Sequence, residues 1–133
     1  MRVLDSRTDG DAIILDLQIT SSRDAPVVTV HTDRPVDDVA IAAGGHPPVT
    51  STPTYADGAE SRKWPYELRF YDPPPDGIRV TLRLPGSEPP RISLSDYTVG
   101  LEQVPGFTAR PAHLDRSLDH SSDLVVVGRT YNP

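Results

Sequence analysis

A short polar stretch near the C-terminus carries the side chains of a hydrolytic centre. Asp119, His120, Ser121, Ser122 and Asp123 offer a nucleophile, a base and an orienting acid, the three parts of a Ser-His-Asp triad. These groups must converge in space, however, and neighbours on an extended segment point in opposite directions. The chain also lacks a G-x-S-x-G nucleophile elbow. We therefore favour a polar turn, in which the side chains bond local backbone, over a Ser/His hydrolase.

The histidines and the acidic loops are the candidates for metal ligands. The histidines stand on four separate segments: His31, His46, His113 and His120. Neither H-E-x-x-H nor a close H-x-H pair occurs, so their spacing does not predict zinc. Two aspartate pairs could attract calcium, although neither has EF-hand spacing: Asp9 with Asp11, and Asp37 with Asp38. The chain has no cysteine. We predict no catalytic residue, no metal site and no cofactor for this chain.

Three aromatic and three basic side chains form the remaining candidate, a ligand-binding or interface surface. The aromatic group brackets one predicted strand and consists of Trp64, Tyr66 and Tyr71. The basic group, which could line up as a stripe on an outer sheet face, consists of Arg69, Arg79 and Arg83. Exposed aromatic rings can serve as stacking platforms, although core packing is the favoured role of Trp64. A row of arginines is also more often a solvated sheet face than a site.

The composition bounds the class of protein that these residues can serve. A chain of 133 residues is one domain by size and can bury a core without disulfides or metals. Its formal net charge of −6 leaves no basic phosphate-binding face, so nucleic acid is not expected as a partner. No apolar run approaches the roughly 20 residues of a membrane span, and the start MRVLDSRTDGD is unlike a signal peptide.

Apolar residues recur with a period of two along most of the chain, which predicts strands rather than helices. Strands are expected at 1–8, 13–20, 25–32, 35–43, 64–71, 78–85, 91–97 and 123–131, with a short edge strand within 49–55. Prolines and glycines cluster between these segments and mark turns. We expect a single all-β domain over residues 1–133. It should be an antiparallel β-sandwich, Ig-like or jelly-roll, with seven to nine short strands.

The connection before the last predicted strand, residues 98–122, is longer than an ordinary loop. We expect a long ordered strap, pinned onto the sandwich by four apolar side chains. These are Leu101, Val104, Phe107 and Leu114. In the strand that follows, one face of the run 124–127 is expected to enter the core. Segments 25–32 and 2–8 are the candidates for sheet edges that could pair between chains.

Two stretches carry more than a generic strand pattern. The first, residues 64–111, contains Pro74-Pro75-Asp76-Gly77, Asp96 with Gly100-Leu101, Pro105-Gly106-Phe107 and Arg110-Pro111. The second, residues 120–131, is HSSDLVVVGRTY. Together they resemble the C-terminal region of actinobacterial-type membrane peptidases of the zinc aminopeptidase family. That family includes bacterial leucine-type aminopeptidases and the membrane proteases of the vacuole and endoplasmic reticulum.

The resemblance implies a place for this chain within a larger protein. In that family a metallopeptidase domain is followed by several membrane spans and a C-terminal extracytoplasmic β domain. The chain would then be a non-catalytic accessory domain, excised from a membrane-bound bacterial zinc peptidase. The zinc ligands and catalytic glutamate belong to the peptidase domain and match no position here. The implied partners are the peptidase domain and membrane region of the parent chain, with a cell-envelope ligand as a further candidate.

A free-standing glycan- or peptide-binding β-sandwich module is the alternative function. An exposed aromatic cluster around Trp64 and Tyr66 would favour it. A response of Trp64 fluorescence to candidate ligands would distinguish it from an accessory domain.

Overall fold

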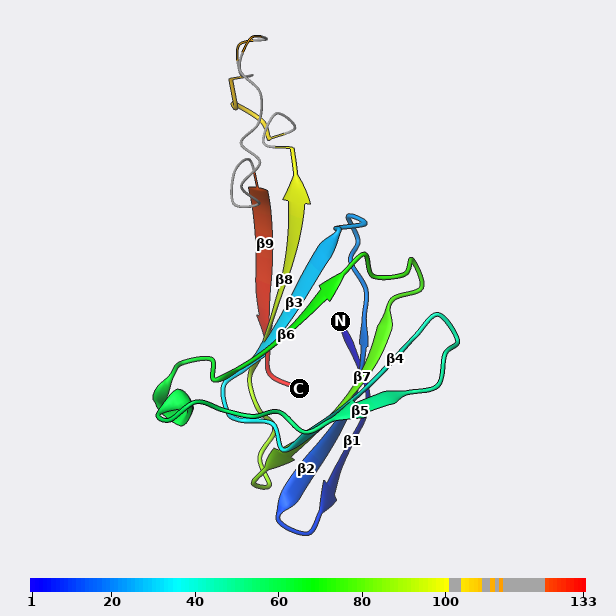
Figure 1. The fold of residues 1–133 in the computed structure, drawn as a ribbon, viewed down its shortest axis with the longest axis vertical. Coiled ribbons are helices and arrows are strands. Elements are labelled where there is room, and N and C mark those ends of the chain that lie inside the picture. Colours follow the sequence, from blue (N-terminus) through cyan, green and yellow to red (C-terminus); the bar gives the residue numbers. More distant parts are fainter. Residues whose placement is uncertain (101–103, 109–110, 112, 114–123) are drawn as a thin grey trace.

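The computed structural model describes residues 1–100, 104–108, 111, 113 and 124–133. The predicted all-β fold is confirmed, because the described residues form nine strands in two antiparallel sheets (Figure 1). The strands are β1 (Arg2–Asp9), β2 (Ala12–Ile19), β3 (Val27–Thr32), β4 (Asp38–Ala43), β5 (Val49–Ser51), β6 (Tyr66–Tyr71), β7 (Ile78–Pro85), β8 (Ile92–Val99) and β9 (Leu124–Tyr131). A short 3-10 helix, η1 (Ala59–Ser61), lies between β5 and β6.

The strand order brings together segments that are distant in sequence. Sheet A has the order β1-β2-β7-β4-β5, and sheet B has the order β6-β3-β8-β9. Every neighbouring pair is antiparallel. The chain changes sheets after β2, β3, β5, β6 and β7. Consecutive strands at each of these changes, such as β6 and β7, therefore present their outer faces on opposite sides of the sandwich.

The core fills the space between the sheets, and the alternation in the sequence predicts most of its members. Eight inward side chains of sheet A are at most 3% exposed: Ile13, Leu15, Leu17 and Ile19 on β2, with Ile78, Val80, Leu82 and Leu84 on β7. Sheet B contributes Val28, Val30, Tyr66 and Ile92. Burying each aliphatic side chain of this size stabilises the fold by about 1.5–3 kcal/mol. The β2–β7 pair is therefore the largest apolar contributor to the sandwich.

The prediction that residues 124–127 enter the core is wrong. Val126 and Val127 are 52% and 50% exposed. Val126 lies on the outer face of sheet B, and Val127 lies on the inner face of the edge strand β9. Only Leu124 and Val125 lie beyond the start of β3, where the β8–β9 pair projects from the sandwich (Figure 1).

The two described anchor side chains of the predicted strap are not buried either. Val104 and Phe107 are 39% and 42% exposed, so neither side chain is pinned in the core as expected. Leu101 and Leu114 lie outside the described residues.

Among the strands that the structure describes, the sheet edges are β1, β5, β6 and β9. The edge predicted at 25–32 is wrong, because β3 pairs with β6 on one side and with β8 on the other. The edge predicted at 2–8 is confirmed as β1. All residues of β1 are exposed, and a bulge between Val3 and Asp5 interrupts its pairing with β2.

One tyrosine fixes the proline-containing connection between β5 and β6. The Tyr55 hydroxyl donates to the Val36 carbonyl oxygen at 2.9 Å and accepts from the Val36 amide at 2.6 Å. Burial raises the pKa of Tyr55, and it raises the pKa of the core residue Tyr66 to about 12. Both phenols therefore stay protonated at neutral pH.

Two threonines of β3 are fully buried but differ in their hydrogen bonds. Thr32 Oγ1 donates to the Arg34 carbonyl oxygen at 2.5 Å. Thr29 Oγ1, on the opposite face of the strand, has no partner in the described part of the chain. A buried hydroxyl without a partner costs about 1–3 kcal/mol.

These two positions give a matched pair of stability variants. Thr29→Val removes the unpaired hydroxyl and keeps the side-chain shape, so the free energy of unfolding should rise by about 1 kcal/mol. Thr32→Val removes a hydrogen bond and should lower it by about 1 kcal/mol. Urea denaturation of both variants beside the parent protein measures the two changes. Two shifts of the same sign would contradict the assigned hydrogen bonding.

Candidate functional site

The side chains predicted to form one interaction surface are divided among three environments. Tyr66 is 6% exposed and belongs to the core, so it is not available at a surface. Arg79 and Arg83 lie on the outer face of sheet A, whereas Arg69 and Tyr71 lie on the outer face of sheet B. These arginines therefore do not form the predicted stripe, because the chain changes sheets between β6 and β7.

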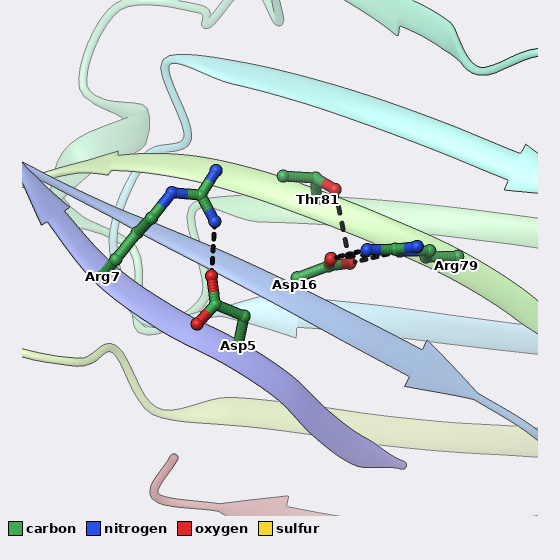
Figure 2. Close-up of polar contacts among 5 residues, drawn as sticks. All are labelled: Asp5, Arg7, Asp16, Arg79 and Thr81. Carbon is green, nitrogen blue, oxygen red and sulfur yellow. Dashed lines mark hydrogen bonds and ion pairs between the residues drawn. The ribbon is translucent and has the colours of Figure 1, made fainter.

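The outer face of sheet A is organised around a buried carboxylate (Figure 2). Asp16 of β2 has a side chain only 7% exposed, although it points away from the core. Arg79 of β7 covers it and donates from Nε to Oδ1 at 2.9 Å and to Oδ2 at 3.0 Å, and from Nη2 to Oδ2. The Thr81 hydroxyl donates to Oδ1 at 3.4 Å. The carboxylate therefore joins β2 to β7 on the face opposite the core.

These contacts fix the charge state of the Asp16–Arg79 pair. Hydrogen bonds from Arg79 lower the pKa of Asp16 below its ordinary value of 3.8, while burial acts in the opposite direction. The same hydrogen bonds raise the pKa of Arg79. Asp16 is thus ionised at neutral pH and fully occupied by donors. The geometry supports a structural cross-link rather than a proton-transfer group.

Two other arginines of this face also have aspartate partners. Arg7 Nη1 lies 2.6 Å from Asp5 Oδ2 on the same strand. Figure 2 shows these two side chains facing one another. Arg83 pairs with Asp9 across sheet A. Three of these four side chains are more than half exposed, so each pair contributes little to stability.

A shallow groove of about 470 Å³ lies on the outer face of sheet A, between Arg7 of β1 and the residues of β5. Its lining includes the hydroxyls of Thr50, Thr52 and Thr81 and the guanidinium groups of Arg7 and Arg83. Such groups can hydrogen-bond a sugar or a carboxylate. Because both arginines already contact aspartates, an anionic ligand would have to compete with those pairs.

The outer face of sheet B carries an apolar row across all four strands. The cross-strand register aligns Tyr71 with Val27, Val27 with Tyr97, and Tyr97 with Val126. We call these four side chains the tyrosine row. Tyr71 and Val126 are 70% and 52% exposed. At about 4.8 Å between strands, the row spans roughly 14 Å.

The next two rows of this face are polar and contain small side chains. The second row is Arg69, Thr29, Ser95 and Gly128, and the third is Glu67, His31, Ser93 and Thr130. A Cβ at Gly128 would lie 3.2 Å from Ser95 Oγ, so glycine suits the close packing there.

The β6 members of these two polar rows are charged. Arg69 Nη2 lies 2.8 Å from Glu67 Oε1. A hydrogen bond with Tyr71 and the charge of Glu67 raise the pKa of Arg69.

Trp64 lies at the far end of this face from the tyrosine row. Trp64 is partly exposed, so it does not occupy the core position that the sequence favoured. Its ring centroid is 6.5 Å from that of His31, and the Arg91 guanidinium carbon lies 5.9 Å from the ring centroid. The cluster thus joins an aromatic surface to a cation.

Sequence reasoning identified Tyr71 but missed its three companions in the tyrosine row. Val27, Tyr97 and Val126 stand on three strands, and only the register reveals that they share one row. Their signal in the sequence is parity, because each alternates with an inward position of its own strand. Parity alone does not say which rows align.

The remaining predicted chemistry has no further support in the structure. Residues 119–123, the candidate hydrolytic stretch and polar corner, lie outside the described residues. They include His120, one of the candidate metal ligands. Within the described ranges, no three His, Cys, Asp or Glu side chains gather in a way that could hold a metal ion. None of the helices in those ranges is long and apolar enough to cross a membrane.

The chain was also compared with known proteins. No family model, no curated protein and no solved structure matches it.

The burial difference within the Asp16–Arg79 pair predicts an asymmetric response to substitution. The Arg79 side chain is 58% exposed, so Asp16→Asn leaves a guanidinium that water can solvate. Arg79→Met leaves a buried carboxylate without its main partner. We expect Arg79→Met to lower the free energy of unfolding more than Asp16→Asn does. Urea denaturation at pH 7 measures both changes in the free energy of unfolding. Equal losses would contradict a buried Asp16 carboxylate whose charge is balanced by Arg79.

The same pair predicts a pH dependence. Because the folded pKa of Asp16 is lowered, its stabilisation is present above about pH 4 and is lost as the pH falls through the folded value. The stability gap between the parent protein and Arg79→Met should therefore narrow below pH 4. A gap that stays constant from pH 7 to pH 2 would show that Asp16 is not the group involved.

Proposed function

We propose that this chain is a non-catalytic accessory domain of a membrane-bound zinc peptidase, located on the extracytoplasmic side of the membrane. In this proposal it packs against the peptidase region of its parent chain through the outer face of sheet B. The zinc and the catalytic residues belong to that region, and this domain supplies recognition and structure.

The tyrosine row is the observation that supports an interface on the outer face of sheet B. A sheet with one solvated face normally alternates apolar inward residues with polar outward ones. On sheet B, two tyrosines and two valines occupy one complete outward row. An exposed apolar patch with a polar border marks a surface that a partner covers. Arg69, Glu67 and the serines of the adjoining rows supply such a border.

The shape of this surface favours a protein partner over a small ligand. Small-molecule sites are concave. The tyrosine row crosses an open sheet, and the groove of sheet A lies on the other side of the sandwich. Exposed tyrosines in an apolar patch with a polar border are typical of protein–protein interfaces.

The identity of the partner is supported by the sequence resemblance. Residues 64–111 include β6, β7 and β8, and residues 120–131 include β9. The segments that resemble the peptidase C-terminal region thus supply three of the four strands of sheet B, namely β6, β8 and β9. This correspondence supports the parent peptidase as the partner.

Replacing both tyrosines tests the interface. The Tyr71→Ser/Tyr97→Ser variant should bind the purified peptidase region of the same reading frame at least about tenfold more weakly, which is a loss of about 1.4 kcal/mol or more. The measurement is titration calorimetry with the 133-residue domain added in trans.

Val49→Ser provides the matched control, because Val49 is exposed to the same extent as Tyr71 but lies on sheet A. This variant should bind like the parent domain. Equal affinities for all three proteins would refute the sheet B interface. A reading frame that encodes no zinc peptidase would refute the accessory role itself.

A glycan- or peptide-binding module is the second candidate, and the Trp64 cluster is the observation that favours it. Trp64 is partly exposed beside His31 and Arg91, an arrangement that can hold a sugar or an aromatic residue. Trp64 is the single tryptophan of the chain, so its fluorescence reports on this position alone.

Ligand titration separates the two candidates. For a binding module, cell-wall glycan fragments or short peptides should change the Trp64 emission saturably, and Arg91→Ala should abolish the change. For an accessory domain, the emission should respond to the peptidase region and not to those ligands. A flat response to glycans and peptides would exclude this cluster as their site.

A further inference from the structure

The four sheet edges differ in how well they resist pairing with another strand. Charged side chains, bulges and short length protect an edge. β1 has charged residues and a bulge, β5 has three residues, and β6 carries Glu67 and Arg69. β9 has eight residues, and its first five, LVVVG, are uncharged. No strand of the described residues pairs with its second edge.

The beginning of β9 is apolar on both faces of sheet B. Val126 lies on the outer face opposite Tyr97, and Val127 lies on the inner face opposite Asp96. Both are about half exposed, because Val126 faces outward and Val127 belongs to the edge strand of sheet B. The hairpin of β8 and β9 therefore presents a long apolar edge with strong β propensity.

We propose that β9 pairs antiparallel with β9 of a second copy of this chain. The two four-stranded sheets B then become one continuous eight-stranded sheet. A two-fold axis relates the copies, as in most homodimers. The axis passes beside Val126, so that Val126 of one copy lies opposite Val126 of the other.

The register follows from side-chain size and polarity. Directly opposite residues lie on the same sheet face, so the symmetric pairing must centre on one residue. Centring on Val126 places Val125 opposite Val127 and Leu124 opposite Gly128. The bulky leucine thus meets a residue with no side chain. Centring on Val127 would instead place Val125 opposite Arg129.

Continuity and charge favour a second copy over another partner. With this register, the tyrosine row of one copy runs directly into that of the other, which joins two apolar rows of the same face. The contacting residues 124–128 are uncharged, although each chain carries a net charge of −6. The strands can therefore approach without opposing like charges, while the long-range repulsion between copies weakens with salt.

The small contact area predicts a weak dimer. Pairing of one strand edge falls at the low end of specific interfaces, below about 1,200 Å² of buried surface. The association should therefore depend on concentration. This inference does not rest on the proposed accessory role, because it concerns β9 of the isolated chain.

Sedimentation equilibrium of the purified chain tests the dimer. Over roughly 10 to 500 µM, the apparent mass should rise from 14.5 kDa toward twice that value, and more steeply in 0.5 M salt than in 0.05 M salt. Val126→Lys and Val126→Glu should each weaken the dimer at least about tenfold, because like charges then lie opposite one another. An equimolar mixture of the two variants should restore dimerisation to within about threefold of the parent chain.

Val49→Lys is the matched control, because it introduces the same charge at an exposed valine on the edge strand β5. It should dimerise like the parent chain, and circular dichroism should show all variants folded. A chain that remains monomeric up to 500 µM overturns the proposal. So does a mixture of charged variants that stays monomeric, or a dimer that survives Val126→Lys. Equal weakening by Val49→Lys would place the contact elsewhere.

Discussion

The pairing of β2 with β7 is the constraint on which the sandwich depends. Its inner face supplies eight nearly inaccessible side chains, and its outer face holds the Asp16–Arg79 pair. The two faces require the same register. A slip by one residue would turn Arg79 and Arg83 into the core and expose Leu82 to water. Apolar packing on one side and a directional ion pair on the other therefore select the same alignment.

The inner half of the fold could be predicted from the sequence, because burial there depends on a local pattern. Ile78, Val80, Leu82 and Leu84 alternate with polar residues, and their burial follows from that alternation. The exposure of residues 124–127 could not be predicted in this way. Those residues are as apolar as any core strand, but β9 is the edge strand of sheet B, and Val126 and Val127 stay about half exposed there. Apolarity indicates what can be buried, whereas register decides what is buried.

The candidate surfaces were harder still to predict from a local sequence pattern. Arg69 and Arg79 belong to consecutive strands with similar patterns, yet the change of sheet places them on opposite sides of the molecule. Conversely, Val27 and Tyr97 come from distant segments and become neighbours through pairing. A surface assembled across strands depends on strand order, and strand order depends on the packing of the whole domain. Single-sequence patterns therefore identified Tyr71 but not its row.

The strand order also has a consequence for how the chain acquires its structure. Leu15 pairs with Leu82 and Val30 pairs with Leu94, contacts that join positions about half the chain apart. Neither β2 nor β3 has its central partner until the second half of the chain is available. The entropy lost in closing these long loops must be overcome before the contacts stabilise the chain. Sandwiches of this kind therefore fold on the order of milliseconds to seconds. During that interval β2 and β3 each lack their central partner strand, so the same order that closes the core makes its assembly slow.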